Sequence, residues 1–240
     1  MPKEKQEKYG DDYFSDSHKN WFSNPDFKLF ELIRKKIIGL KGEGPLRILD
    51  VGCGRGDFLK YLKERHSAFE LHGIDLTDND DPGIHYIKGD IMNSEIEDTF
   101  DVICNITVVE HLDSPHSFVK RMKNLLRPDG IMFTVTDNDD SMIYRIARVL
   151  KRAGISAAYK RLYDLHHLQC FSNNSLRTLM IMNDLDIVDH RNHNHPARAV
   201  DYPVSGIVTK FLYMAAVRII FFLSTLCKDG ILQVVICRRK

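Results

Sequence analysis

Cysteine is scarce in this chain, and its number and spacing argue against a domain stabilised by disulfides or by zinc. The five cysteines are odd in number and form no C-x-x-C pair, so we expect neither a disulfide framework nor a zinc site. An excess of one charge is also lacking. The formal net charge of +1 argues against broad electrostatic binding of nucleic acid. The first eight residues are polar and charged and contain no apolar signal core, so we expect a cytoplasmic protein.

The composition is that of an ordinary globular domain. A chain of 240 residues with 43% hydrophobic and 28% charged residues fits one α/β domain with insertions. We divide it into an N-terminal tail and helix, residues 1–44, and a main domain, residues 45–240, with insertions at about 137–170 and 194–229. Asn24 is expected to cap the first helix. Residues 1–20 are either a frayed tail or a segment that folds over a ligand.

The chain is organised around residues 46–57, where an apolar run ends in Asp50 and three glycines alternate. This pattern predicts a buried strand, a tight loop and a helix, and glycines let such a loop approach a ligand closely. A plain strand-to-helix turn is the alternative. The dinucleotide pattern G-x-G-x-x-G would place its third glycine at position 57, which is Asp57. Because a carboxylate repels a pyrophosphate, the loop better suits a cofactor with a cationic or neutral head.

Three further predicted strands also end in polar residues. The run 69–76 contains Asp75, placed 25 residues after Asp50, near the spacing at which an acid reaches a ribose. The run 85–91 contains Gly89-Asp90, and the run 100–105 is followed by Glu110-His111. Carboxyl ends of parallel strands meet at one edge of a sheet, where open α/β folds bind ligands.

Taken together, these blocks resemble the class I S-adenosylmethionine-dependent methyltransferases. The similar blocks are LDVGCGRGDFL, GID, GDI and FDVICNITVVEHL, followed by LLRPDGIMFTV, and they cover about residues 46–136. The block HLQCFS at 167–172 and the stretch WFSNP at 21–25 are similar to ubiquinone-biosynthesis O-methyltransferases and to methyltransferases of glycan-biosynthesis clusters. The resemblance implies a doubly wound, seven-stranded, mainly parallel sheet with an antiparallel last strand. One departure is that only eight residues separate Asp75 from Ile84, so the second crossover helix is shortened or lost.

The resemblance also implies S-adenosylmethionine as cofactor, held at the carboxyl ends of the first four strands. Gly52 and Gly54 are expected to lie against its methionine part, Asp75 to accept both ribose hydroxyls, and Asp90 to contact the adenine amine. The full expected set of cofactor-binding residues is Asp50, Gly52, Cys53, Gly54, Asp75, Leu76, Asp90, Ile91 and Asn105.

Two histidines are the predicted catalytic residues. A hydroxyl acceptor needs a base near neutral pH, and histidine suits that role. His111 lies at the carboxyl end of the sheet, and His167 lies in a basic segment; each is interpreted as a base or an acceptor clamp. The alternatives are a loop-ordering role for His111 and a packed imidazole for His167. Adjacent histidines do not face the same way on a helix, so the pair 166–167 predicts no metal site.

Both predicted insertions are basic. Residues 141–165 contain six basic residues and one acid, and residues 194–240 contain seven basic residues and two acids. Residues 211–227 are almost wholly apolar, but Arg218 makes crossing a membrane costly. The segment 207–227 is therefore interpreted either as a buried lid helix or as a helix lying in a membrane interface.

The function predicted from these features is methyl transfer from S-adenosylmethionine to a small-molecule, sugar or lipid-linked acceptor, with oxygen favoured over nitrogen. A binding or scaffold protein that kept the fold without catalysis is the alternative. An NAD-dependent reductase is a third hypothesis, and Asp57 counts against it. No nucleic-acid partner is expected.

Overall fold

The structure is a computed structural model that describes residues 23–163, 167–200 and 206–240, with the backbone alone at positions 207 and 210. The predictions for residues 1–20, and His166, lie outside the described residues. The strands are β1 (Arg47–Val51), β2 (Glu70–Asp75), β3 (His85–Lys88), β4 (Phe100–Ile106), β5 (Leu126–Asp137), β6 (Leu185–His193) and β7 (Leu232–Arg239). The helices are α3 (Phe27–Lys41), α4 (Asp57–Lys63), α5 (Pro115–Leu125), α6 (Met142–Arg152), α7 (Ala157–Leu162), α8 (Asn173–Met182) and α9 (Ile207–Leu226), with 3-10 turns η3 (Val109–His111) and η4 (Ala197–Ala199).

The strands form one seven-stranded sheet in the order β3-β2-β1-β4-β5-β7-β6. Strands β1 to β5 pair in parallel, and β7 runs antiparallel to both β5 and β6. The predicted doubly wound, mainly parallel sheet with an antiparallel last strand is confirmed. In the register, Asp50 of β1 pairs with Gly73 of β2 and Cys104 of β4, so the loops that follow these strands meet at one edge.

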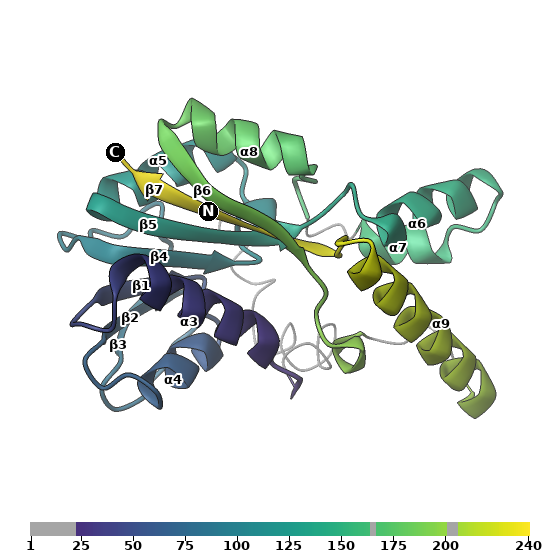
Figure 1. Cartoon of the computed structure of the whole chain (residues 1–240), viewed down its shortest axis with the longest axis horizontal. Helices are drawn as coiled ribbons and strands as arrows, with labels where there is room; N and C mark the ends of the chain where they lie inside the picture. Colours follow the sequence, from purple (N-terminus) through teal and green to yellow (C-terminus); the bar gives the residue numbers. More distant parts are fainter. Residues whose placement is uncertain (1–22, 164–166, 201–205) are drawn as a thin grey trace.

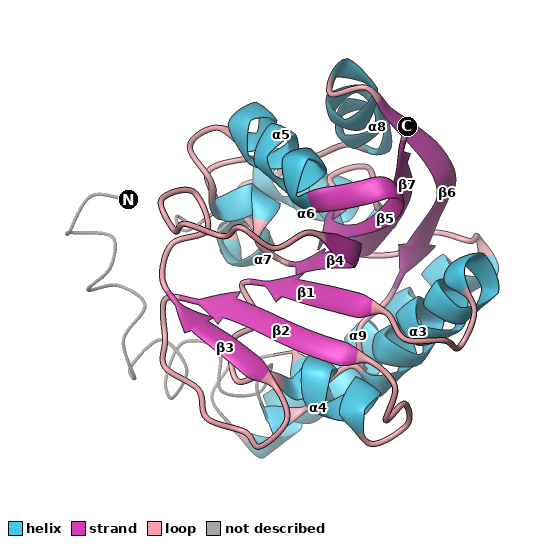
Figure 2. Cartoon of the chain, turned by 90° about the vertical axis from the view of Figure 1, so that its left-hand side faces the viewer, coloured by secondary structure: helices cyan, strands magenta, loops and turns pink. Residues whose placement is uncertain are grey.

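Helices cover both faces of the sheet (Figure 2), and each face has its own apolar core. On one face, α3 and α4 pack on the sheet through buried residues that include Ile33, Ile37 and Leu59. On the other face, α5 and α8 pack through Phe118 and Met180. Burial of apolar surface on both faces explains why the central strands are continuous apolar runs. The described helix α3 packs into the same apolar core as β1 and α4.

The first helix begins later than predicted. Its N-cap is Asp26, whose side chain accepts a hydrogen bond from the Leu29 amide at 3.0 Å. The prediction that Asn24 caps this helix is wrong. Both residue types accept a bond from a helix amide, so composition alone does not choose between positions two residues apart. Asp26 is also bonded to His193 of β6 at 2.7 Å, which ties the start of α3 to the far edge of the sheet.

The crossover between β2 and β3 contains no helix, as the spacing predicted. Residues 76–84, all of which the structure describes, connect two parallel strands through turns alone. Most parallel crossovers need a dozen or more residues and a helix. The short connection leaves this part of the carboxyl edge open. It also places the loop after Asp75 beside the glycine loop, where the side-chain amide of Asn79 donates to the Gly54 carbonyl at 2.6 Å.

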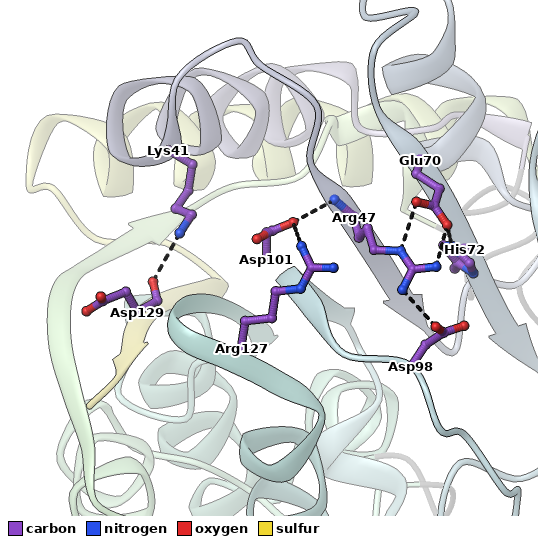
Figure 3. A network of polar contacts seen from close by, with 8 residues as sticks. All are labelled: Lys41, Arg47, Glu70, His72, Asp98, Asp101, Arg127 and Asp129. Atoms are coloured by element: carbon purple, nitrogen blue, oxygen red, sulfur yellow. Dashed lines mark hydrogen bonds and ion pairs between the residues drawn. The ribbon is translucent and has the colours of Figure 1, made fainter.

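The amino ends of the strands are held by a separate polar network (Figure 3). Arg47 of β1 donates to both carboxylate oxygens of Glu70, at 2.8 and 2.7 Å, and to Asp98 at 2.7 Å. Asp101 accepts from the Arg47 amide at 2.9 Å and from Arg127 at 2.8 Å. The network joins β1, β2, β4 and β5 at the end of the sheet opposite the predicted site, which makes it a useful control region.

The two predicted insertions carry α6–α7 and η4–α9. Figure 1 shows both groups beyond the carboxyl ends of the parallel strands, with α9 projecting away from the sheet. On α6 the buried side chains are Tyr144 and Ala147, while Ile146 and Val149 are exposed. In α9, Val217 and Phe221 are buried, whereas most of its other apolar residues are not. Among the described residues, no helix has the length and apolarity needed to cross a membrane.

Candidate active site

One cavity of about 450 Å³ lies at the carboxyl edge of the sheet. This volume is in the range of small-molecule sites. One end of the cavity is formed by the glycine loop after β1 and the ends of β2 and β3. The other end is formed by η3, α6, α7 and the inner face of α9. Both predicted insertions therefore contribute to the wall.

The glycine loop is shaped for close approach, but its amides are used within the protein. Gly52 has a φ of 69°, and a Cβ there would lie 2.4 Å from the Val108 side chain. The Gly52 and Cys53 amides donate to the Ile74 carbonyl, at 2.8 and 3.2 Å, and the Gly54 amide donates to Asp75 at 2.8 Å. These amides are not available to a phosphate. The helix after the loop, α4, has only seven residues.

Asp75 lines the cavity at the end of β2 and already accepts three hydrogen bonds from the protein. One oxygen accepts from Gly54; the other accepts from the Thr77 amide at 2.9 Å and the Thr77 hydroxyl at 2.7 Å. A carboxylate has about four acceptor positions. One position is therefore left for a ligand, and binding of both ribose hydroxyls requires the Thr77 hydroxyl to turn away.

Asp50 is the clearest sign that a ligand belongs at this end. It is buried, lines the cavity, and its Oδ1 has no hydrogen-bond partner among the residues that the structure describes. Burial, assisted by the Asp75 carboxylate, raises the pKa of Asp50 well above its usual range. An unpaired buried carboxyl is costly, and a cationic or hydrogen-bond-donating group would relieve that cost. With Asp57, Asp75 and Asp90, four carboxyls line this end, which disfavours a pyrophosphate.

The remaining predicted cofactor residues divide into two groups. Cys53, Leu76, Asp90 and Ile91 line the cavity together with Asp50, Gly52, Gly54 and Asp75. Asn105 is not part of the wall that the described residues form. Its side chain is fully buried in the sheet and donates to the Phe133 carbonyl and the Thr134 hydroxyl of β5, both at 3.0 Å. It joins β4 to β5, and we leave it out of the proposed site.

The other end of the cavity brings both predicted catalytic histidines together. The rings of His111 and His167 meet edge to face, with centroids 4.9 Å apart, although the residues are far apart in sequence. The Gln169 amide donates to the Glu110 carbonyl at 3.0 Å, which holds the segment of His167 against η3. Thr107, just before η3, has a φ of 55°, a strained conformation for a β-branched residue. Such strain is common at functional sites.

His167 is oriented by an acid at the end of β5. Its Nδ1 lies 3.1 Å from an Asp137 carboxylate oxygen. The same Asp137 oxygen accepts a hydrogen bond from the Tyr144 hydroxyl of α6 at 2.8 Å. A carboxylate at Nδ1 fixes the orientation of an imidazole and favours its protonated form. The arrangement is that of a positioned base.

Glu110 is a buried carboxyl beside these histidines. Its Oε2 accepts from the Thr136 hydroxyl at 2.9 Å, and in the described part of the chain its Oε1 has no hydrogen-bond partner. Burial, followed by the nearby Asp137 carboxylate, raises the pKa of Glu110 to about 7, against a lowering effect of His167. This carboxyl therefore changes its charge near neutral pH.

Three of these side chains are close enough to share one ion. The potential ligand atoms of Glu110, His111 and His167 lie within 4.8 Å of one another. A histidine whose second nitrogen is held by a carboxylate, as His167 is by Asp137, is typical of metal ligands. The prediction of no metal site concerned the adjacent pair 166–167, whereas this cluster combines His167 with two residues that are distant in sequence.

Sequence reasoning placed His111 and His167 in the site but missed Glu110, Asp137 and Tyr144. For two of these residues, the position in the sequence already indicated a place in the site. Glu110 precedes His111 at the end of β4, and Asp137 closes β5, the same strand-end position that identified Asp75. The position of Tyr144 gave no such indication, because its role depends on the way α6 packs.

The fold and this cavity define a class I S-adenosylmethionine-dependent methyltransferase, whose cofactor is S-adenosylmethionine. The profile of the methyltransferase domain family matches residues 26–190, and the chain belongs to this family. The unpartnered Asp50 and the four carboxyls at the glycine-loop end fit a cofactor whose head is cationic.

The chain is similar to ubiquinone biosynthesis O-methyltransferases. It is 28% identical to the mitochondrial protein of Dictyostelium discoideum over 136 residues, covering 48% of this chain and 42% of that protein. It is 32% identical to the protein of Maricaulis maris over 130 residues, covering 46% and 49%. The chain thus spans about half the length of the curated relatives it matches.

The fold is also similar to that of a Burkholderia thailandensis 1,6-didemethyltoxoflavin-N1-methyltransferase solved with S-adenosylhomocysteine. The TM-score is 0.61 at 17% identity, over 100% of this chain and 91% of that one. At this identity the likeness concerns the fold alone.

Proposed function

We propose that this protein transfers the methyl group of S-adenosylmethionine to a hydroxyl oxygen of a small, largely apolar acceptor, a class that includes lipid-linked compounds. One observation carries the proposal. A single cavity connects the carboxyl-lined glycine loop with the His111–His167 pair and an apolar wall.

At the glycine-loop end, three carboxyls would hold the cofactor. Asp50 offers its unpartnered oxygen, Asp75 its remaining acceptor position, and Asp90 lies at the end of β3. When bound, the cofactor supplies an activated methyl group on a positively charged sulfur. The protein's main contribution is to align this group with the acceptor, and orientation can supply several kcal/mol of the reduction in the barrier.

At the other end, His167 takes the proton of the acceptor hydroxyl. Asp137 at Nδ1 orients the ring and stabilises the imidazolium that forms when the base takes the proton. His111, in edge-to-face contact with His167, fixes the second side of that ring. A positioned base of this kind contributes about a hundredfold or more to the rate.

The acceptor end has walls that suit an apolar compound better than a sugar. Leu162 of α7 and Tyr213, Val217 and Phe221 of α9 line it. Such side chains bind rings and hydrocarbon chains and offer few partners for the many hydroxyls of a sugar. The similarity to ubiquinone biosynthesis O-methyltransferases supports the same class of acceptor.

One observation favours a second way to activate the hydroxyl. The unpartnered Glu110 Oε1 and the spacing of Glu110, His111 and His167 would suit a divalent cation that lowers the pKa of a bound hydroxyl. In that case His167 binds the ion and is not the base.

The first experiment is calorimetry of the purified protein with S-adenosylhomocysteine and, separately, with NAD. We expect binding of the former and none of the latter. Transfer of isotope-labelled methyl groups is then measured with hydroxylated aromatic, prenylated and sugar acceptors. Binding of NAD alone would refute the proposal, and cofactor binding without turnover on any acceptor would favour a scaffold protein.

A further inference from the structure

Helix α9 has two opposite faces, both apolar. The face toward the sheet contains Tyr213, Val217 and Phe221, which line the acceptor end of the cavity. The opposite face is an exposed stripe of large apolar residues at helical spacing. We call it the outer stripe, and its members are Val208, Phe211, Leu212, Ile219, Phe222, Leu223 and Leu226.

The outer stripe is far more exposed than a lid helix requires. Phe211 is 70% exposed, Phe222 is 64% and Leu226 is 66%. Because a helix has 3.6 residues per turn, steps of three and four residues place all seven side chains within one narrow arc. A contiguous exposed apolar surface of this kind marks an interaction site. The helix extends away from the sheet, so little else of the described chain covers it (Figure 1).

Charge decides which partner fits. Helices α6, α7 and α9 contain no aspartate or glutamate. Exposed cations lie on all three: Arg145, Lys151, Arg152, Lys160, Arg161 and Arg218. Helix α6 contacts α9 and adds Val149, which is 62% exposed. Helices α6, α7 and α9 thus combine exposed apolar residues with exposed cations and carry no carboxylate.

We propose that α9, together with the exposed side of α6, docks on an anionic phospholipid surface and presents the acceptor end of the cavity to the bilayer. A second copy of the chain fits less well, because a symmetric interface would place the same basic residues opposite each other. A helix with an apolar face and flanking cations lies in the interface without crossing the membrane. The cavity would then stand one helix diameter, about 10 Å, from the lipid.

This inference rests on the proposed function, since it explains how an apolar acceptor reaches His167. It deepens that proposal by assigning α9 two roles. The inner face shapes the acceptor end, and the outer stripe brings the cavity to the membrane in which such acceptors dissolve.

Vesicle flotation tests it with the full chain. The vesicles contain phosphatidylcholine with phosphatidylglycerol, or phosphatidylcholine alone. We expect the wild type to float with the anionic vesicles and to be released as the ionic strength is raised from about 0.05 to about 0.5 M, because salt screens surface charge. Arg218→Gln should reduce partitioning about fivefold, the value of one cation near such a surface.

The decisive variant is Phe211→Ser/Phe222→Ser, which removes two members of the outer stripe. It should lower partitioning by at least about tenfold. The matched control is Ile181→Ser/Met182→Ser, which changes two residues of similar exposure, 58% and 66%, at the end of α8. This control should float like the wild type. Melting temperature and S-adenosylhomocysteine binding without vesicles show that each variant is folded.

Three results would overturn the inference. One is a wild type that binds S-adenosylhomocysteine but stays soluble at low salt, which leaves the proposed function intact. Another is equal flotation of the stripe variant and the wild type. The third is a dimer in light scattering that the stripe variant abolishes, since the stripe would then be a contact between copies. Failure of the proposed function is read separately, from calorimetry in the absence of lipid.

Discussion

The Glu110→Gln variant should gain stability relative to the wild type as the pH rises. In the folded protein the pKa of Glu110 is about 7, raised from 4.5 chiefly by burial. Between these values the folded state holds a proton that the unfolded chain has released. The stability that Glu110 contributes is therefore complete below about pH 4.5 and is lost as the pH rises through about 7.

The structure sets the size of this effect. A difference of about 2.5 pKa units corresponds to about 3 kcal/mol at most, at 1.36 kcal/mol per unit. Glutamine keeps an acceptor for the Thr136 hydroxyl, which lies 2.9 Å from Glu110 Oε2, but does not ionise. The difference in unfolding free energy, variant minus wild type, should thus increase by up to about 3 kcal/mol between pH 5 and pH 8.

Urea denaturation at a series of pH values measures this difference, because a two-state transition yields the unfolding free energy directly. Glu70→Gln is the matched control. Arg47 lowers the pKa of Glu70 to about 2, so its contribution is lost only in acid and its pH 5–8 difference should be flat. Parallel pH profiles for Glu110→Gln and the wild type would refute the assignment of Glu110 as a buried, neutral-pH carboxyl.

The remaining predictions concern the two ends of the cavity. Asp75→Ala should weaken S-adenosylhomocysteine binding by about 1.5–3 kcal/mol, measured by calorimetry, while Arg47→Ala at the opposite end of the sheet should not; equal affinities would remove Asp75 from the site. His167→Ala should reduce turnover about a hundredfold with cofactor affinity unchanged, and full activity would show that alignment suffices without this base. Asp137→Asn should reduce turnover in the same assay by freeing the His167 ring, whereas an unaffected rate would separate the two residues. Chelation of divalent cations should leave turnover intact; a loss that Mg²⁺ restores would assign Glu110 and both histidines to a metal.

The cofactor end could be predicted because its signals are local. Each of Asp50, Asp75 and Asp90 follows an apolar run, and a parallel sheet gathers such strand ends at one edge. Asn105 met the same criterion but points into the sheet. The alternation of side chains along a strand decides this, and an apolar run buried on both faces hides that alternation.

The histidine end of the cavity was only partly predictable, because its parts come from distant segments. His167 reaches His111 across 56 residues, and Asp137 meets His167 only because β5 ends beside it. Helix α6 shows the limit of pattern reading. Its apolar residues Ile146 and Val149 point outward, while Tyr144 turns inward to bond Asp137.

The two ends of the cavity are built from different kinds of connection between the strands. Short loops after β1, β2 and β3 form the cofactor end, and their hydrogen bonds to one another leave little freedom. The acceptor end is built from η3 after β4 and from the long connections after β5 and β6. These two long connections also carry the cations and the outer stripe. A change of acceptor would therefore require changes only in these connections. Exchanging α9 for a polar helix should alter acceptor choice and vesicle binding together while leaving S-adenosylhomocysteine affinity unchanged, and an altered cofactor affinity would contradict this division.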